Sequence, residues 1–111
     1  MHPDDDRAYE IMEAPLHAAI ARLAESRFST KRLIAEIRAS ADGDAAYREA
    51  MATLGPDPGS ERMGMMVLHG QVIPGLLRRS GLVRFGGFIH GNAAEDDGFG
   101  VPSLWVKNPV A

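Results

Sequence analysis

The chain of 111 residues contains no cysteine, which excludes disulfide bonds, thiolate metal sites and a thiol nucleophile. It also lacks any apolar run long enough to span a bilayer, so we expect no membrane partner. The chain begins with Met1-His2-Pro3-Asp4-Asp5-Asp6, a start that is acidic where a secretory signal would be basic. These absences predict a cytoplasmic protein.

The chain has fewer basic than acidic residues, 12 against 15, and its net charge is -3. This balance argues against a strongly electrostatic nucleic-acid binder. The basic residues are unevenly distributed, however. The stretch from residue 62 to residue 91 contains no acidic residue and four arginines, namely Arg62, Arg78, Arg79 and Arg84.

The remaining composition is that of an ordinary globular protein, with 45% hydrophobic and 24% charged residues. The length suits one hydrophobic core and is too short for two independent ones. We therefore expect a single domain over residues 1–111.

Helical periodicity covers the first two thirds of the chain, from about residue 4 to residue 80. Apolar residues of the first segment fall at near-helical spacing. Pro15 lies inside this segment and predicts either a second helix that begins near Ala14 or a kink. Ser29 or Thr30 can cap the next helix.

A turn is predicted at Ser40–Gly43, followed by a third helix that Asp44 caps and that Gly55 ends. Beyond the loop at 56–59, we expect a helix from about Ser60 to Leu68 and a turn through His69–Gln71. A further helix would open near residue 74 and end at residue 81.

The pattern changes to strand periodicity from Leu82, where Val83, Phe85 and Gly87 alternate with Arg84. An acidic loop at 91–100 would lead into a returning strand that ends near residue 107. The sequence thus predicts an α+β fold, with a helical N-terminal two thirds and a C-terminal β-hairpin at about 82–107.

The apolar positions of these elements give a predicted core. It consists of Phe28, Leu33, Ile37, Leu54, Val67, Leu76, Leu77 and Val83. Met63, Met65 and Met66 could form an adaptable partner surface, but their helical spacing favours packing in the core. An outward-facing Trp105 would indicate a partner protein.

The segment 72–83 has a short helix with an apolar back and a basic front, ending at Gly81 where a strand begins at once. It resembles the junction of recognition helix and wing in winged helix-turn-helix proteins. The resemblance extends over about residues 28–107 in the order of elements. It implies a winged-helix-like fold in which Ile73, Leu76 and Leu77 pack inward while arginines face a DNA groove.

Two observations weigh against this interpretation. A pair of arginines at the end of a helix also complements the helix dipole on an ordinary solvated surface. A wing that contacts phosphates normally carries basic residues, whereas this loop has Glu95, Asp96 and Asp97. We therefore expect the tip of the loop to lie away from DNA.

Catalytic and metal-binding patterns are weak. Asp96, Asp97 and Gly98 do not have the spacing of a calcium loop. His69 and His90 could meet and, with a carboxylate, bind zinc, although isolated histidines are more often core or surface groups. A hydrolase would pair Ser80 or Ser103 with a histidine, but neither serine lies in the context of a nucleophile elbow. We expect neither an enzyme nor a bound cofactor or metal.

The favoured hypothesis is a DNA-binding winged-helix protein that acts as a transcriptional or accessory regulator on double-stranded DNA. Its predicted DNA-binding residues are Arg62, His69, Gln71, Arg78, Arg79 and Arg84. A homodimer joined by the N-terminal helices is expected, because one short recognition helix has little reach. The alternatives are a protein-interaction module that uses the hairpin and acidic loop, and a small metal-dependent enzyme.

Overall fold

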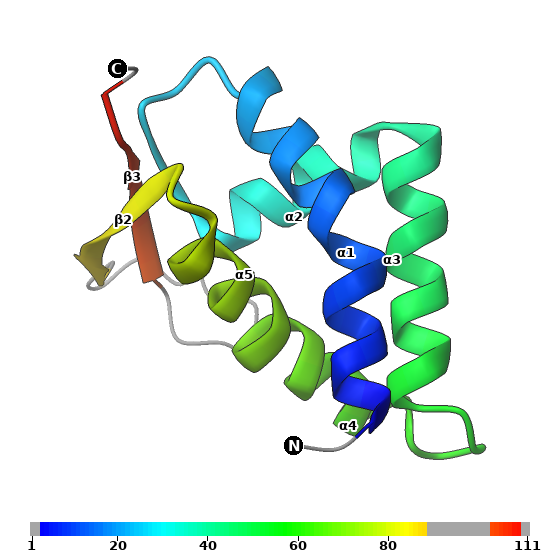
Figure 1. The fold of residues 1–111 in the computed structure, drawn as a ribbon. Coiled ribbons are helices and arrows are strands. Elements are labelled where there is room, and N and C mark those ends of the chain that lie inside the picture. The colour runs from blue at the N-terminus through cyan, green and yellow to red at the C-terminus, as the bar shows by residue number, and fades with distance from the viewer. Residues whose placement is uncertain (1–2, 89–102, 110–111) are drawn as a thin grey trace.

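The computed structural model describes residues 3–88 and 103–109. Figure 1 shows helices packed together beside a small sheet. The predicted α+β class and the antiparallel strand pair near the C-terminus are confirmed, while the predicted loop at 91–100 lies outside the described residues. The elements in chain order are α1 (Pro3–Arg22), β1 (Arg27–Ser29), α2 (Thr30–Ala39), α3 (Ala41–Leu54), α4 (Glu61–Val67), the π-helix η1 (Leu68–Val72), α5 (Ile73–Ser80), β2 (Val83–Phe88) and β3 (Ser103–Lys107).

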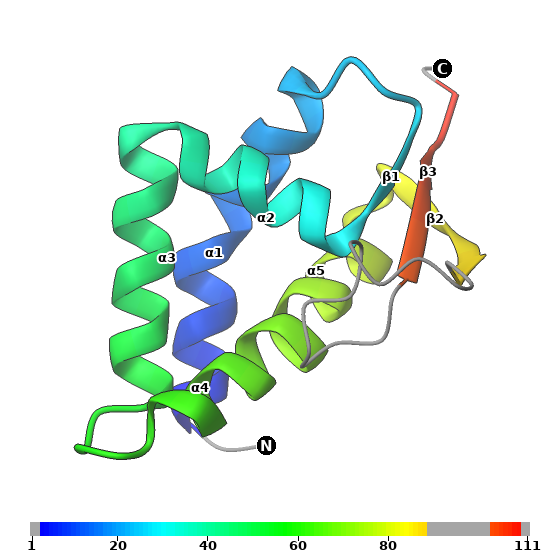
Figure 2. The same ribbon diagram turned by 180° about the vertical axis from the view of Figure 1, so that it is seen from behind.

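Helix α1 lies at the centre of the helical part, side by side with α3 and in contact with α2 and α5 (Figures 1 and 2). Apolar residues recur at helical spacing along its inner face, where Ala8, Met12, Leu16 and Ala19 are fully buried. The helix continues through Pro15, so the predicted second helix near Ala14 is wrong. Buried residues on both sides of the proline pack into one core, which offsets the hydrogen bond that proline removes.

The N-terminus of α2 is confirmed, because the Ser29 hydroxyl accepts a hydrogen bond from the Arg32 amide at 3.0 Å. The turn predicted at Ser40–Gly43 is wrong. The Ser40 hydroxyl accepts from the Gly43 amide at 2.9 Å and caps α3, so Asp44 lies in the first turn instead of capping it. Two helices therefore meet at one serine without an intervening loop.

The turn predicted at His69–Gln71 is also wrong, because α4, η1 and α5 follow one another without a break. A π-helical turn accommodates one extra residue and so changes the phase of a helix. That change keeps Leu68, Val72 and Leu76 fully buried on the same side. The predicted end at Gly81 is confirmed, since this glycine has a φ of 76°, which favours residues without a side chain.

The sheet contains a strand that the sequence did not predict. The short strand β1 pairs with β3, which also pairs with β2, giving the antiparallel order β1-β3-β2. At its centre Trp105 of β3 lies between Phe28 and Phe85. Trp105 is fully buried and its indole N–H donates to the Thr30 hydroxyl at 2.9 Å. It therefore joins sheet to helices and is not the outward-facing contact that would have indicated a partner.

Most of the predicted core is confirmed. Six of its members are buried, namely Phe28, Leu33, Ile37, Leu76, Leu77 and Val83, while Leu54 and Val67 pack against it partly buried. The prediction that the methionines lie in the core is wrong for two of them. Met63 is 61% exposed and Met66 is 44% exposed, both on α4.

Candidate nucleic-acid interface

Helix α5 has an apolar face on the core and a cationic end near the sheet. Ile73, Leu76 and Leu77 are fully buried, as predicted, which leaves Arg78 and Arg79 exposed in the last turn. Gly81 then turns the chain into β2 after a two-residue connection. The short connection places the end of α5 directly beside the edge strand of the sheet.

The two neighbouring arginines point to different parts of the molecule. The Arg78 guanidinium lies 5.8 Å from the centroid of the Trp105 ring, on the sheet side of α5. The Arg79 guanidinium lies 4.7 Å above the Tyr9 ring and 4.0 Å from the Glu13 carboxylate, both on α1. Successive residues on a helix are about 100° apart, which accounts for this divergence. Only Arg78 of the pair faces the sheet.

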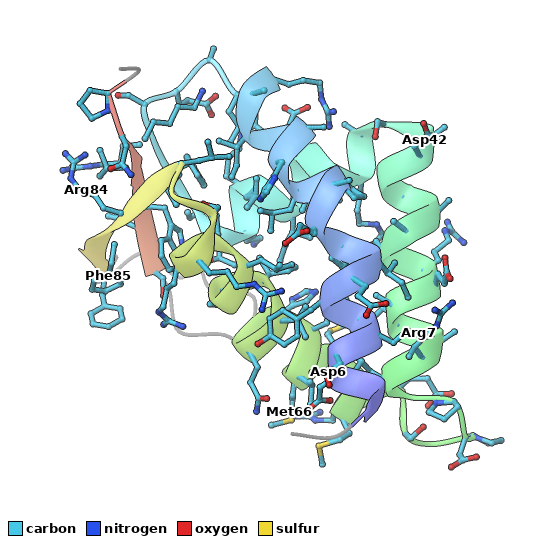
Figure 3. The ribbon with its side chains drawn as sticks, in the orientation of Figure 1. Asp6, Arg7, Asp42, Met66, Arg84 and Phe85 are labelled. Carbon is cyan, nitrogen blue, oxygen red and sulfur yellow. The ribbon has the colours of Figure 1, made fainter. Side chains whose placement is uncertain are left out.

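The outer face of the sheet carries two further arginines. Arg27 on β1 and Arg84 on β2 are both register partners of Val106 on the central strand, so their side chains project from the same face. Arg84 donates to the Lys107 carbonyl and to the Asn108 side-chain oxygen, at 3.4 and 3.5 Å. These acceptors are neutral, so Arg84 has no carboxylate partner within residues 3–88 and 103–109. Figure 3 shows Arg84 projecting away from the molecule.

A β-bulge changes the phase of β2. Phe85 pairs with Trp105 while Gly87 pairs with Leu104, so Gly86 is the extra residue. The bulge depends on glycine: Gly87 has a φ of 104°, and a Cβ on Gly86 would lie 2.8 Å from a methyl group of Val106. As a consequence Phe88 emerges on the same face as Phe85, although simple alternation had predicted opposite faces.

These residues border a hollow between the α4–α5 run and the sheet, which we call the aromatic hollow. Its volume is about 370 Å³. Phe85 is 48% exposed and Phe88 is 47% exposed, and their rings meet edge to face with centroids 5.0 Å apart. The described residues around the hollow are His69, Gly70, Pro74, Arg78, Phe85, Phe88 and Ser103. Arg78 is the cationic side chain of this set.

The structure does not bring the six predicted DNA-binding residues to one surface. His69 is buried and its ring Nε2 lies 2.7 Å from the Tyr47 hydroxyl, so it is part of the core with one edge at the hollow. Gln71 is exposed near α1, where its carbonyl accepts from the Tyr9 hydroxyl. Arg62 is exposed in the first turn of α4. Of the six, His69 and Arg78 line the hollow, and Arg78 is the exposed one. The neighbouring phenylalanines were not predicted from the sequence, because the bulge changes the face on which Phe88 lies.

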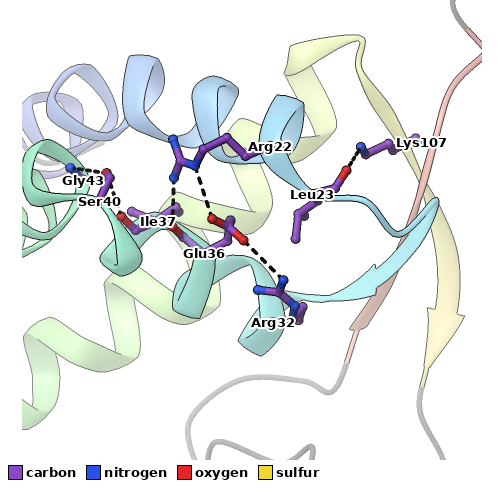
Figure 4. Close-up of polar contacts among 8 residues, drawn as sticks. All are labelled: Arg22, Leu23, Arg32, Glu36, Ile37, Ser40, Gly43 and Lys107. Carbon is purple, nitrogen blue, oxygen red and sulfur yellow. Dashed lines mark hydrogen bonds and ion pairs between the residues drawn. The ribbon is translucent and has the colours of Figure 1, made fainter.

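Arginines of the helical part behave differently, because they pair with carboxylates. Arg22 and Arg32 both bond the Glu36 carboxylate at 3.2 Å (Figure 4). Arg32 also bonds the Glu25 carboxylate at 2.9 Å. At the start of α3, Arg38 and Arg48 bond opposite oxygens of Asp44. The hydrogen bond from Arg38, followed by that from Arg48, holds the pKa of the Asp44 carboxyl below its ordinary value.

The metal-binding hypothesis finds no assembled ligand set within residues 3–88 and 103–109. No three histidine or acidic side chains of this part of the chain come close enough to hold a metal ion. His90, Glu95, Asp96 and Asp97, on which the metal and acidic-loop hypotheses depend, lie outside the described residues.

Comparison with known proteins adds no relative: no family model, no curated protein and no solved structure matches this chain. Within the described residues, no helix is long and apolar enough to cross a membrane. Function is therefore inferred from the geometry of the chain itself.

Proposed function

We propose that the protein is a DNA-binding domain of the winged-helix type that acts as a transcriptional or accessory regulator in the cytoplasm. The observation that carries the proposal is the passage from α5 through Gly81 into the edge strand β2, which presents Arg78 beside the sheet without a carboxylate partner among the described residues. A helix that ends at glycine and continues into a strand is the feature by which the sequence resembles the recognition helix and wing.

The charge of this region supports a polyanionic partner. From residue 62 to residue 88 the chain carries four arginines and no acidic residue. Arg84 adds a cation on the edge strand, bonded only to neutral oxygens among the described residues. Arginine pairs with phosphate and can also donate two hydrogen bonds to guanine. A protein with a net charge of -3 should bind through few phosphate contacts, and its binding should be sensitive to salt.

The test compares two adjacent arginines of one helix. Arg78→Ala should weaken binding to duplex DNA and lower the slope of log affinity against log salt by about 0.9 for one lost phosphate contact. Arg79→Ala is the matched control, because Arg79 lies over Tyr9 and should change the slope little. Fluorescence anisotropy at several salt concentrations measures both, and circular dichroism verifies the fold. Absence of duplex binding at low salt, or equal effects of the two substitutions, would contradict the proposal.

A second candidate is a protein-interaction module. The observation in its favour is the exposure of Phe85 and Phe88 on the edge strand, since adjacent exposed aromatic residues are frequent at protein interfaces. It is distinguished by the same titration: this function predicts no salt-dependent duplex binding and no difference between Arg78→Ala and Arg79→Ala.

The homodimer expected from the sequence stays a prediction. Sedimentation velocity with and without duplex DNA tests it, because a recognition helix that needs a two-fold partner should give a dimer on a palindromic duplex. A monomer in both states would show that one domain binds alone.

A further inference from the structure

The aromatic hollow contains two exposed rings that the proposed duplex contact does not use. Phe85 and Phe88 leave about half of their surfaces exposed, and Phe85 also stacks edge to face on Trp105 with centroids 5.7 Å apart. Trp105 is fully buried, so the exposed pair stands on a rigid support. Arg78 lies over the same tryptophan and supplies positive charge beside the rings.

The position of the two phenylalanines is set by the backbone. Without the extra residue at Gly86, strand alternation would place Phe88 on the outer face with Arg84. The bulge instead places both rings on the face that meets α5, at an opening of about 370 Å³. Pockets that hold small planar ligands begin at about this size.

We propose that the aromatic hollow binds a single unstacked nucleotide, whose base lies on the Phe85 and Phe88 rings and whose phosphate pairs with Arg78. This inference rests on the proposed function and adds a substrate class, namely DNA that offers an unpaired base next to a duplex. Exposed aromatic rings beside a cation are the elements with which proteins bind single-stranded nucleic acid, because every base has a face that can stack.

Charge favours a nucleotide over an apolar peptide as the occupant. An apolar side chain that filled the hollow would remove the Arg78 guanidinium from water without giving it a partner, which is unfavourable. A nucleotide supplies both the apolar ring face and the anion. The absence of acidic residues between residues 62 and 88 means that no neighbouring carboxylate in the sequence of this segment repels a phosphate.

The experiment compares one duplex in two forms, blunt and with a short single-stranded overhang, using the full chain at low salt. The overhang form should bind at least about five-fold more tightly, the lower limit for stacking of one base on an aromatic side chain. Phe85→Leu and Phe88→Leu should each reduce this preference while leaving affinity for the blunt duplex unchanged. Met66→Leu is the matched control at an exposed apolar residue of α4 and should change neither affinity.

A fluorescent adenine analogue in the overhang gives an independent readout, because stacking on the rings should quench it with wild-type protein and not with the leucine variants. A free nucleoside monophosphate added as competitor shows whether the hollow binds a free nucleotide or only a nucleotide at the end of a DNA strand. If it abolishes the overhang preference, the hollow accepts any nucleotide; if it does not, the strand end is required.

Equal affinity for blunt and overhang DNA would overturn this inference and leave the proposed function standing. Loss of blunt-duplex affinity in a folded Phe85→Leu or Phe88→Leu variant would also overturn it, because the rings would then belong to the duplex contact. Absence of binding to either DNA would overturn both proposals.

Discussion

The arginines of the helical part and those of the α5–sheet side have different surroundings. On α1, α2 and α3, arginines such as Arg7, Arg22 and Arg48 form ion pairs with carboxylates. On the α5–sheet side, Arg78 lies over an aromatic ring and Arg84 bonds neutral oxygens. Figure 3 shows Arg7 and Arg84 at opposite sides of the molecule. Among the described residues, carboxylates therefore pair with the arginines on the helical side and not with Arg78 or Arg84 on the other side.

This difference shows why the net charge is a poor guide to partners for this protein. Surface ion pairs contribute little stability individually, but they remove the positive potential that would attract phosphate. A cation that lies on a ring or a carbonyl keeps its potential. We therefore expect the ion pairs to add only a little stability, and we propose that the arginines of the α5–sheet side bind the anionic partner.

The largest expected effect concerns Trp105, which joins the two regions. Trp105→Ala should reduce the free energy of unfolding by about 3 to 5 kcal/mol, because it opens a cavity where the sheet meets the helices. Urea denaturation followed by circular dichroism measures the change. A loss below about 1 kcal/mol, smaller than core truncations of this kind cost, would mean that the sheet is not held to the helices at this residue.

A smaller loss of stability should follow removal of the Thr30 hydroxyl, which accepts the hydrogen bond from the Trp105 indole. Thr30→Val keeps the shape of the side chain but leaves the buried indole N–H without its acceptor, which should cost about 1 to 3 kcal/mol. Thr30→Ser retains the hydroxyl and serves as the control. If the valine and serine variants were equally stable, the hydrogen bond would contribute nothing measurable to the junction.

The smallest expected effect concerns the ion pairs of the helical part, on α2 and α3. Asp44→Asn should lower the melting temperature at neutral pH, because Arg38 and Arg48 stabilise the ionised carboxyl and lower its pKa. The folded pKa lies below the unfolded one, so the stabilisation is present above the unfolded value of about 3.9 and is lost as the pH falls through the folded value. The difference between variant and wild type should therefore vanish in acid.

Asp42→Asn is the control for this prediction, since Asp42 shares the first turn of α3 and makes no ion pair among the described residues. Asp44→Asn should also leave duplex affinity unchanged, in contrast to Arg78→Ala. A difference in melting temperature that persists unchanged at low pH would show that the ion pairs are not its cause.

Local signals in the sequence predicted much of the fold. Ser29 as a cap, Gly55 as a helix end and Gly81 before a strand each act within a few residues, and all three are confirmed. Strand β1 could not be predicted, because three residues carry no periodicity and its partner β3 lies more than 70 residues away in the chain. The π-helix η1 was missed because Gly70 resembles a turn residue, while the burial that maintains the helix is tertiary.

The candidate site was predicted only in part. The basic end of α5 follows from composition and helical spacing, but whether Arg78 or Arg79 faces the sheet depends on the packing of α1. The aromatic hollow depends on a bulge at Gly86, whose presence is decided by pairing with β3. Strand alternation alone therefore placed Phe88 on the wrong face.

We propose that DNA contacts the α5–sheet side and not the ion-paired helices. Titration of nitrogen-15-labelled protein with a short duplex at low salt tests it most directly, because amide chemical shifts report the contact residue by residue. We expect shifts concentrated between Arg78 and Phe88, with the amides of α3 from Ala41 to Leu54 unchanged. Shifts concentrated on α3, or no shift at any ratio of DNA to protein, would contradict it.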